Sequence, residues 1–302
     1  MKIKELKVSQ QKYLIVIGVH KAGTTSLYKY LSEQPLIFRP EKKELHFFTP
    51  YVYNNLTIDV SGYNDLFKGS KADEILLDIS PSYIYGKARL AKALSKQMDS
   101  YYIVMLRDPV SRFVSFYKQS LKRGEIKKSM SLSEFYELSK LEFESGVENN
   151  IYVNRALREG CYSIYLKDWI NIANKDLKIV FFENFITNPE SELNDIYDWL
   201  KLGRPIKRHD YSVENSSFVP YYTGIHQIIL KLYSVGEQYF RKFDRIISVI
   251  KPVYVKLIGS NKLQQINPSD LIVISSFYSS YNEELRSILS QYDLDLPKWL
   301  SK

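Results

Sequence analysis

The chain has 302 residues, of which 45% are hydrophobic, and carries a formal net charge of +8. This length and composition predict a globular protein with a packed core. No run approaches the roughly 18 uninterrupted apolar residues of a membrane span, and residues 1–12 lack the apolar stretch of a signal peptide, so we expect no membrane segment.

The charge surplus suits an anionic cofactor or acceptor, or simply a solvated face, and does not imply nucleic-acid binding. A single cysteine, Cys161, excludes an intrachain disulfide and favours a reducing compartment, for which the cytoplasm is the default. The sequence shows no repeat and no Pro/Gly/Ser-rich linker. We therefore predict one domain over residues 1–302, with residues 1–12 as an N-terminal extension.

The first informative stretch is YLIVIGVHKAGTTSLYKYL, residues 13–31. Leu14 to Ile17 predict a buried strand, residues 18–25 a tight loop, and Ser26 onward a helix with apolar residues at three- and four-residue spacing. Strand, loop and helix in this order direct backbone N–H groups and the positive end of a helix dipole at an anion. A phosphorylated ligand is therefore expected here.

The lysine of this loop does not fit a Walker A motif, because Lys21 precedes Gly23 by two residues instead of following it. The run KAGTTSL resembles the 5′-phosphosulfate loop of sulfotransferases that use 3′-phosphoadenosine 5′-phosphosulfate (PAPS). The resemblance implies cofactor contacts from His20, Lys21, Ala22, Gly23, Thr24, Thr25 and Ser26. The alternative is an ordinary strand-to-helix turn with a solvated lysine.

Residues 37–48, IFRPEKKELHFF, contain a candidate catalytic base. If the segment is extended, Glu44 and His46 project from the same side. Sulfuryl transfer to a hydroxyl or amine needs a group that accepts the acceptor's proton, and a partly desolvated Glu suits this task. The run KELHFF resembles a segment of heparan-sulfate-type glycan sulfotransferases, which implies that Glu44 is the base and that His46 supports the acceptor or the base. The alternative is a surface charge run before a buried strand.

Residues 75–83, ILLDISPSY, predict a second buried strand. In the resembling family this strand ends in an acidic residue, Lys, Ser or Thr, and Pro, whereas Ile79 stands at the lysine position here. This departure favours an acceptor less anionic than heparan-type chains. Residues 87–96 predict a basic surface helix.

A second strand-to-helix junction follows in YYIVMLRDPVSRFVSFYKQ, residues 101–119. Residues 102–106 predict a strand, and Asp108-Pro109 is typical of a helix start. RDPVSRFVSFY resembles the family's 3′-phosphate motif, which implies that Arg107 and Ser115 hold that phosphate. An arginine offers fork-like donors to a dianion, although Arg107 could also be an ordinary ion-pair residue.

The remaining segments are less specific. Residues 120–150 predict a helical excursion or loop cluster, and residues 158–170 resemble a family segment that implies a nucleotide contact from Tyr162, with Leu166 and Trp169 expected in the core. Residues 177–182 predict a strand and 190–202 an amphipathic helix. Glu183 lies between them, where it either supports the base or, as we favour, caps a turn. Residues 225–258 predict amphipathic helices, and residues 277–299 resemble the family's closing helix.

Strands alternating with helices predict an α/β fold with a central parallel sheet flanked by helices, and the resemblance implies the P-loop-like sulfotransferase fold. It further implies in-line sulfuryl transfer from PAPS, with PAP as product, to a hydroxyl or amine on a carbohydrate or glycolipid. In this scheme Glu44 is the base, Lys21 stabilises the departing phosphate, and no metal takes part. A P-loop phosphotransferase and a catalytically silent nucleotide- or glycan-binding module are the alternatives.

Overall fold

The computed structural model describes residues 11–54, 56–146, 155–204, 219–220, 259–260 and 266–301. The described residues fall into two compact units. The first contains those within Met1–Arg112, Glu159–Glu214 and Tyr278–Lys302, and the second those within Phe113–Arg158 and Asn215–Phe277. Because the second unit interrupts the first in sequence, the expectation of a single domain stays a prediction.

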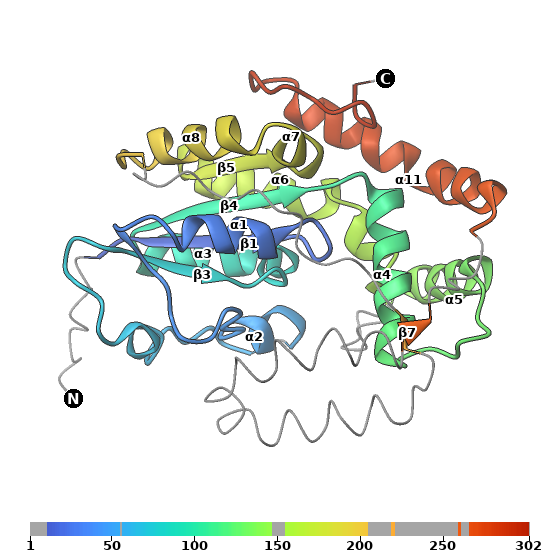
Figure 1. Cartoon of the computed structure of the whole chain (residues 1–302), viewed down its shortest axis with the longest axis horizontal. Coiled ribbons are helices and arrows are strands. Elements are labelled where there is room, and N and C mark those ends of the chain that lie inside the picture. Colours follow the sequence, from blue (N-terminus) through green and yellow to red (C-terminus); the bar gives the residue numbers. More distant parts are fainter. Residues whose placement is uncertain are drawn as a thin grey trace. The chain divides into compact units, whose positions relative to one another are not determined.

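The first unit contains a five-stranded parallel sheet with strand order β2-β3-β1-β4-β5 (Figure 1). The strands are β1 (Tyr13–Gly18), β2 (Ile37–Phe38), β3 (Ile75–Ile79), β4 (Ser100–Leu106) and β5 (Leu177–Phe181). Every residue of β1 is buried, as expected for a central strand whose two faces are covered by helices. Three of the four predicted strands in these regions are confirmed to within two residues at each end, whereas the strand predicted over residues 75–83 ends at Ile79.

Helices pack on both faces of this sheet. α3 (Lys87–Gln97) packs against α6 (Ser163–Ala173), and the right-handed crossover rule places both on the face opposite α1 (Thr24–Leu31). On the α1 face, the hydroxyl of Tyr197 in α8 (Pro189–Trp199) donates a hydrogen bond to the carbonyl of Tyr30, at 3.3 Å. The predicted helices over residues 87–96 and 190–202 are therefore confirmed.

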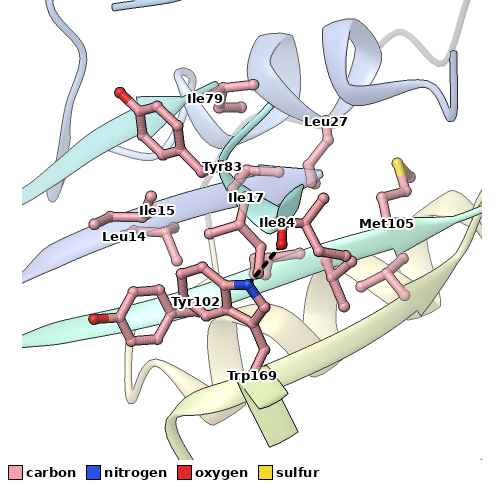
Figure 2. Close-up of a cluster of buried hydrophobic side chains, with 14 of the residues drawn as sticks. Leu14, Ile15, Ile17, Leu27, Ile79, Tyr83, Ile84, Tyr102, Met105 and Trp169 are labelled. Atoms are coloured by element: carbon pink, nitrogen blue, oxygen red, sulfur yellow. Dashed lines mark hydrogen bonds between the residues drawn. The ribbon is translucent and has the colours of Figure 1, made fainter. Parts of the chain in front are cut away.

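Trp169 anchors one side of the core, as Figure 2 shows. Its ring is fully buried against Tyr102 of β4, and its indole N–H donates to the carbonyl of Ile84 at 3.0 Å. Leu166 is fully buried as well, so the prediction that this pair belongs to the core is confirmed.

Residues 120–150, predicted as a helical excursion or loop cluster, contain α5 (Leu132–Glu144) in the second unit. This helix begins with a capping box, in which Ser131 and Glu134 each accept a hydrogen bond from the other's backbone N–H. The second unit also contains the antiparallel pair β6 (Val219–Pro220) and β7 (Gly259–Ser260). The long helices α4 (Pro109–Arg123) and α11 (Pro268–Leu289) each contribute residues to both units.

Two expectations are not tested by the described residues, and one is corrected. The helices predicted over 225–258 and the N-terminal extension lie almost wholly outside the described part of the chain. Residues 37–48 do not form one extended segment: β2 ends at Phe38, residues 39–48 are irregular, and the short helix α2 (Thr49–Tyr53) follows. The chain bends at residues 41–43 and turns again at His46, whose φ of 53° lies in the left-handed region.

Candidate active site

The loop between β1 and α1 has the backbone geometry of an anion site. Lys21 and Gly23 both have positive φ, at 70° and 85°. The N–H groups of Ser26 and Leu27 turn back to the carbonyl of Gly23, at 3.0 and 3.3 Å. The first N–H groups of a helix have no intrahelical partner, and in α1 these are the N–H groups of Thr24 and Thr25, which precede the two that bond to Gly23. The start of α1 can therefore donate N–H groups to a phosphate.

The ring of His20 contacts a buried carboxylate. Its Nδ1 lies 3.0 Å from Oε2 of Glu159, a residue that follows in sequence 139 positions later. The same oxygen lies 3.8 Å from Nη1 of Arg112, and the side chains of Glu159 and Arg112 are 2% and 0% exposed. A charged pair this deeply buried fixes its neighbours in place, because displacing either charge would leave the other uncompensated. The pair thereby fixes the ring of His20, which is itself a residue of the loop.

Arg107, at the end of β4, joins the second motif to the first. Its Nη1 donates to the carbonyl of Lys21 at 2.9 Å, and its guanidinium lies 4.4 Å from the ring centroid of Phe182. Its Nε is buried and has no hydrogen-bond partner among the described residues. Burial lowers the pKa of Arg107, while the nearby carboxylate of Glu183 opposes that shift. The guanidinium is thus fixed in orientation and retains a donor for an anion.

Tyr162 contacts the backbone of Arg107. Its hydroxyl donates to the Arg107 carbonyl at 2.8 Å, and the side chain is 1% exposed. Burial raises the pKa of this phenol. The contact that the structure shows for Tyr162 is with the backbone of Arg107, and its predicted contact with the nucleotide stays a prediction.

The start of α4 confirms the predicted cap. The carboxylate of Asp108 accepts hydrogen bonds from the backbone N–H of Val110 and Ser111, at 3.3 and 3.0 Å. Glu183 accepts a hydrogen bond from the Asp108 N–H at 2.9 Å and so ties the end of β5 to this junction. It lies in the first turn of the short helix α7 (Phe182–Thr187) instead of capping a turn, as the sequence predicted. Ser115 lies further along α4, in the second unit, and its assignment to the 3′-phosphate stays a prediction.

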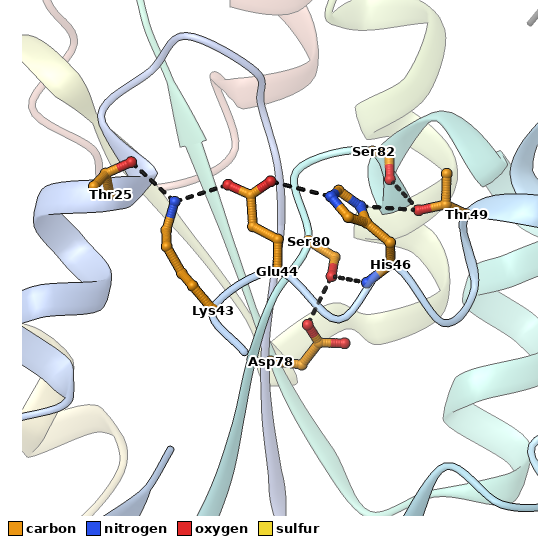
Figure 3. Close-up of polar contacts among 8 residues, drawn as sticks. All are labelled: Thr25, Lys43, Glu44, His46, Thr49, Asp78, Ser80 and Ser82. Atoms are coloured by element: carbon orange, nitrogen blue, oxygen red, sulfur yellow. Dashed lines mark hydrogen bonds and ion pairs between the residues drawn. The ribbon is translucent and has the colours of Figure 1, made fainter. Parts of the chain in front are cut away.

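The candidate base lies in a chain of polar contacts (Figure 3). Oε2 of Glu44 lies 3.1 Å from Nε2 of His46, and Oε1 accepts a hydrogen bond from Lys43 at 2.7 Å. Nδ1 of His46 lies 3.3 Å from the hydroxyl of Thr49. The predicted pairing of Glu44 with His46 is therefore present, although the segment is not extended.

These contacts determine the charge state of Glu44. Burial alone would raise its pKa, but the hydrogen bond from His46 and the charge and hydrogen bond of Lys43 outweigh burial and lower the pKa to about 2. The side chain is 34% exposed, so an acceptor can reach it. Glu44 is an accessible carboxylate held firmly ionised.

The turn at His46 is hydrogen-bonded to residues at the end of β3. The backbone N–H of His46 donates to the hydroxyl of Ser80 at 3.0 Å, and that hydroxyl donates to Asp78 at 2.7 Å. Tyr63 donates to the second oxygen of Asp78 at 2.8 Å. Burial raises the pKa of Asp78, while the hydrogen bonds from Ser80 and Tyr63 oppose the rise. This buried network holds His46 in its strained conformation and so orients the ring toward Glu44.

Sequence reasoning missed several of these residues. Lys43 could have been found from its position next to Glu44, and Ser80 from its place at the carboxyl end of a predicted strand. Glu159 leaves no local signal, because its partners lie far away in the sequence. The same holds for Phe182, whose ring lies against Gly23.

Comparison with known proteins decides the family. A model of the sulfotransferase domain matches residues 11–221, a span that contains the loop, Glu44 and Arg107. The chain belongs to the sulfotransferase family, a family of enzymes. A solved sulfotransferase from Alicyclobacillus acidocaldarius superposes with a TM-score of 0.65 at 19% identity, covering 96% of this chain and 98% of that one. The predicted sulfotransferase fold is confirmed.

The curated relatives of this sulfotransferase act on a glycan according to their names. Human heparan sulfate glucosamine 3-O-sulfotransferase 3B1 is 30% identical over 208 residues, which cover 68% of this chain and 50% of the relative. The mouse protein of the same name is 28% identical over 206 residues, with the same coverage of each chain. The chain thus spans about half the length of the curated relatives it matches.

None of the described helices combines the length and apolar character needed to cross a membrane. No group of three or more His, Cys, Asp or Glu side chains in the described residues is arranged to hold a metal ion.

Proposed function

We propose that this sulfotransferase moves a sulfuryl group from PAPS to a hydroxyl or amine on a carbohydrate or glycolipid acceptor. The observation that carries the proposal is the hydrogen bond from Arg107 to the carbonyl of Lys21, because it joins two anion-binding motifs in one site. A nucleotide with a phosphate at each end of its ribose matches such a pair of motifs. The names of the curated relatives support a glycan acceptor.

The residues present fit PAPS. The start of α1 and Lys21 would hold the 5′-phosphosulfate. The Nε of Arg107, which is buried and unpartnered within the described part of the chain, supports an anion beside it. Ser115 would complete the 3′-phosphate site. When bound, PAPS supplies the sulfuryl group and a phosphate leaving group.

The reaction requires one proton transfer and one displacement. Glu44 accepts the proton of the attacking hydroxyl or amine while that atom bonds to sulfur. The bond between sulfur and the bridging phosphate oxygen breaks, and the electron pair leaves with the phosphate. Lys21 and the N–H groups at the start of α1 stabilise the charge that develops on the leaving oxygen. Fixing these groups on the ends of neighbouring strands provides the orientation that in-line transfer needs.

Three substitutions test these roles. Lys21→Ala and Arg107→Ala should each weaken binding of adenosine 3′,5′-bisphosphate at least tenfold, because each removes a cation from a phosphate. Glu44→Gln should retain binding and lose at least a hundredfold in turnover of PAPS on a panel of heparan-type oligosaccharides and glycolipids. Lys68→Ala, at a lysine with 79% of its side chain exposed, is the control for loss of charge. Unchanged affinity in both cation variants would remove the assignment of the site.

A further inference from the structure

Lys43 links the candidate base to the anion-binding loop. Its ammonium lies 2.7 Å from Oε1 of Glu44 and donates to the hydroxyl of Thr25 at 2.9 Å (Figure 3). Thr25 lies in the first turn of α1, where the 5′ end of the nucleotide is expected, whereas Glu44 lies in the irregular segment after β2. One cation therefore lies between the two sites that the reaction must coordinate.

This arrangement leaves Glu44 a poor proton acceptor. The carboxylate is paired with Lys43 on one oxygen and with His46 on the other. Two cationic or hydrogen-bonding partners stabilise the ionised form of a carboxylate and so lower its affinity for a proton. General-base catalysis becomes less effective as the basicity of the group falls. Catalysis therefore requires that one of these contacts loosens.

Lys43 is the contact suited to loosen. A lysine ammonium is a point charge on a flexible stem and can follow a nearby anion, whereas His46 is held by its backbone bond to Ser80 and by Thr49. An anion at the start of α1 would compete with Glu44 for the ammonium. The end of β3 offers no lysine for this role, because Ile79 occupies the position at which the resembling family has lysine. The side chain of Ile79 is fully buried.

Resting on the proposed function, we propose that Lys43 is a positioning residue shared between Glu44 and the sulfuryl donor. The anionic donor at the start of α1 attracts the ammonium, which keeps its contact with Thr25 and moves away from Glu44, so that Glu44 gains basicity when the donor is in place. Lys43 thus couples occupancy of the loop to readiness of the base.

A double-mutant cycle on donor binding tests this coupling. The ligand is PAPS without an acceptor, with its affinity measured by calorimetry at neutral pH on Lys43→Met, Glu44→Gln and the double variant. Glu44→Gln should tighten binding about three- to tenfold, because Lys43 is then released to the donor. In the Lys43→Met background the same substitution should change affinity less than twofold. Lys42→Met, at the exposed neighbouring lysine, controls for loss of charge.

The outcomes separate the coupling from its alternatives. If Glu44→Gln tightens binding equally in both backgrounds, the carboxylate repels the donor directly and the shared role of Lys43 is wrong. If the unmodified protein does not bind PAPS, the proposed function itself fails, and the coupling fails with it.

A pH profile distinguishes positioning from a merely structural role. In Lys43→Met, the acidic limb of the kcat/KM profile should move to higher pH, because Glu44 loses one of the two partners that lower its pKa. Lys43→Arg, which keeps the charge, should restore the limb to near its original position. A limb that does not move in Lys43→Met would contradict the proposal, since a structural lysine would lower the rate without shifting the profile.

Discussion

Gly23→Ala should damage both stability and nucleotide binding, for reasons that the structure separates. Gly23 has a φ of 85°, and a Cβ at this position would lie 2.7 Å from two atoms of the Phe182 ring. A left-handed backbone costs a residue with a Cβ about 1–2 kcal/mol, and overpacking a filled site costs about 1–3 kcal/mol. The free energy of unfolding should therefore fall by roughly 2–5 kcal/mol. Displacing Phe182 should also disturb Arg107, which lies against that ring.

Gly62→Ala provides the matched control. Gly62 has a φ of 79°, but a Cβ there would meet nothing within 4 Å, so this variant carries the backbone cost alone. Urea unfolding of both variants measures the difference, and calorimetry with adenosine 3′,5′-bisphosphate measures the effect on binding. If the two variants lose equal stability, Phe182 does not fill the space next to Gly23 and the reasoning is wrong.

Other predictions address the groups around the site. Glu159→Gln removes the buried charge between His20 and Arg112 and should cost about 3–5 kcal/mol in urea unfolding, whereas a loss under 1 kcal/mol would show that the pair contributes little. Because the folded pKa of Glu44 is about 2, below its ordinary value of 4.5, its favourable contribution to stability is present above pH 4.5 and disappears as pH falls through about 2. The stability difference between the original protein and Glu44→Gln should follow this window, and a difference that does not vary with pH would contradict the low pKa. Tyr162→Phe should cost about 1 kcal/mol, with nucleotide affinity reduced rather than lost, and complete loss of binding would indicate direct contact with the nucleotide.

The sheet could be predicted from sequence because its strands are continuous apolar runs. β1 and β4 are buried on both faces by helices, so their composition alone marks them. The positions of the two motifs followed, since each motif begins where a buried strand ends. The sequence also contains a signal for the start of α5, the capping box of Ser131 and Glu134. The charged residues around this helix lack a clear apolar pattern, so its bounds could not be predicted.

The details of the site could not be predicted, because they depend on contacts between distant residues. The turn at His46 is held by Ser80, 34 positions away, so no local pattern indicates that the segment leaves the extended conformation. Glu159 reaches His20 across 139 positions for the same reason. Lys43 resembled part of a solvated charge run, and only the fold brings it to Thr25.

Calorimetric binding of adenosine 3′,5′-bisphosphate, beside ATP and ADP and with and without magnesium, tests the central claim most directly. The hydrogen bond from Arg107 to the Lys21 carbonyl brings the two proposed phosphate motifs together, so we expect tight binding of the bisphosphate that is independent of metal, and weak binding of ATP. Preferential binding of magnesium-ATP would contradict the account and favour a phosphotransferase.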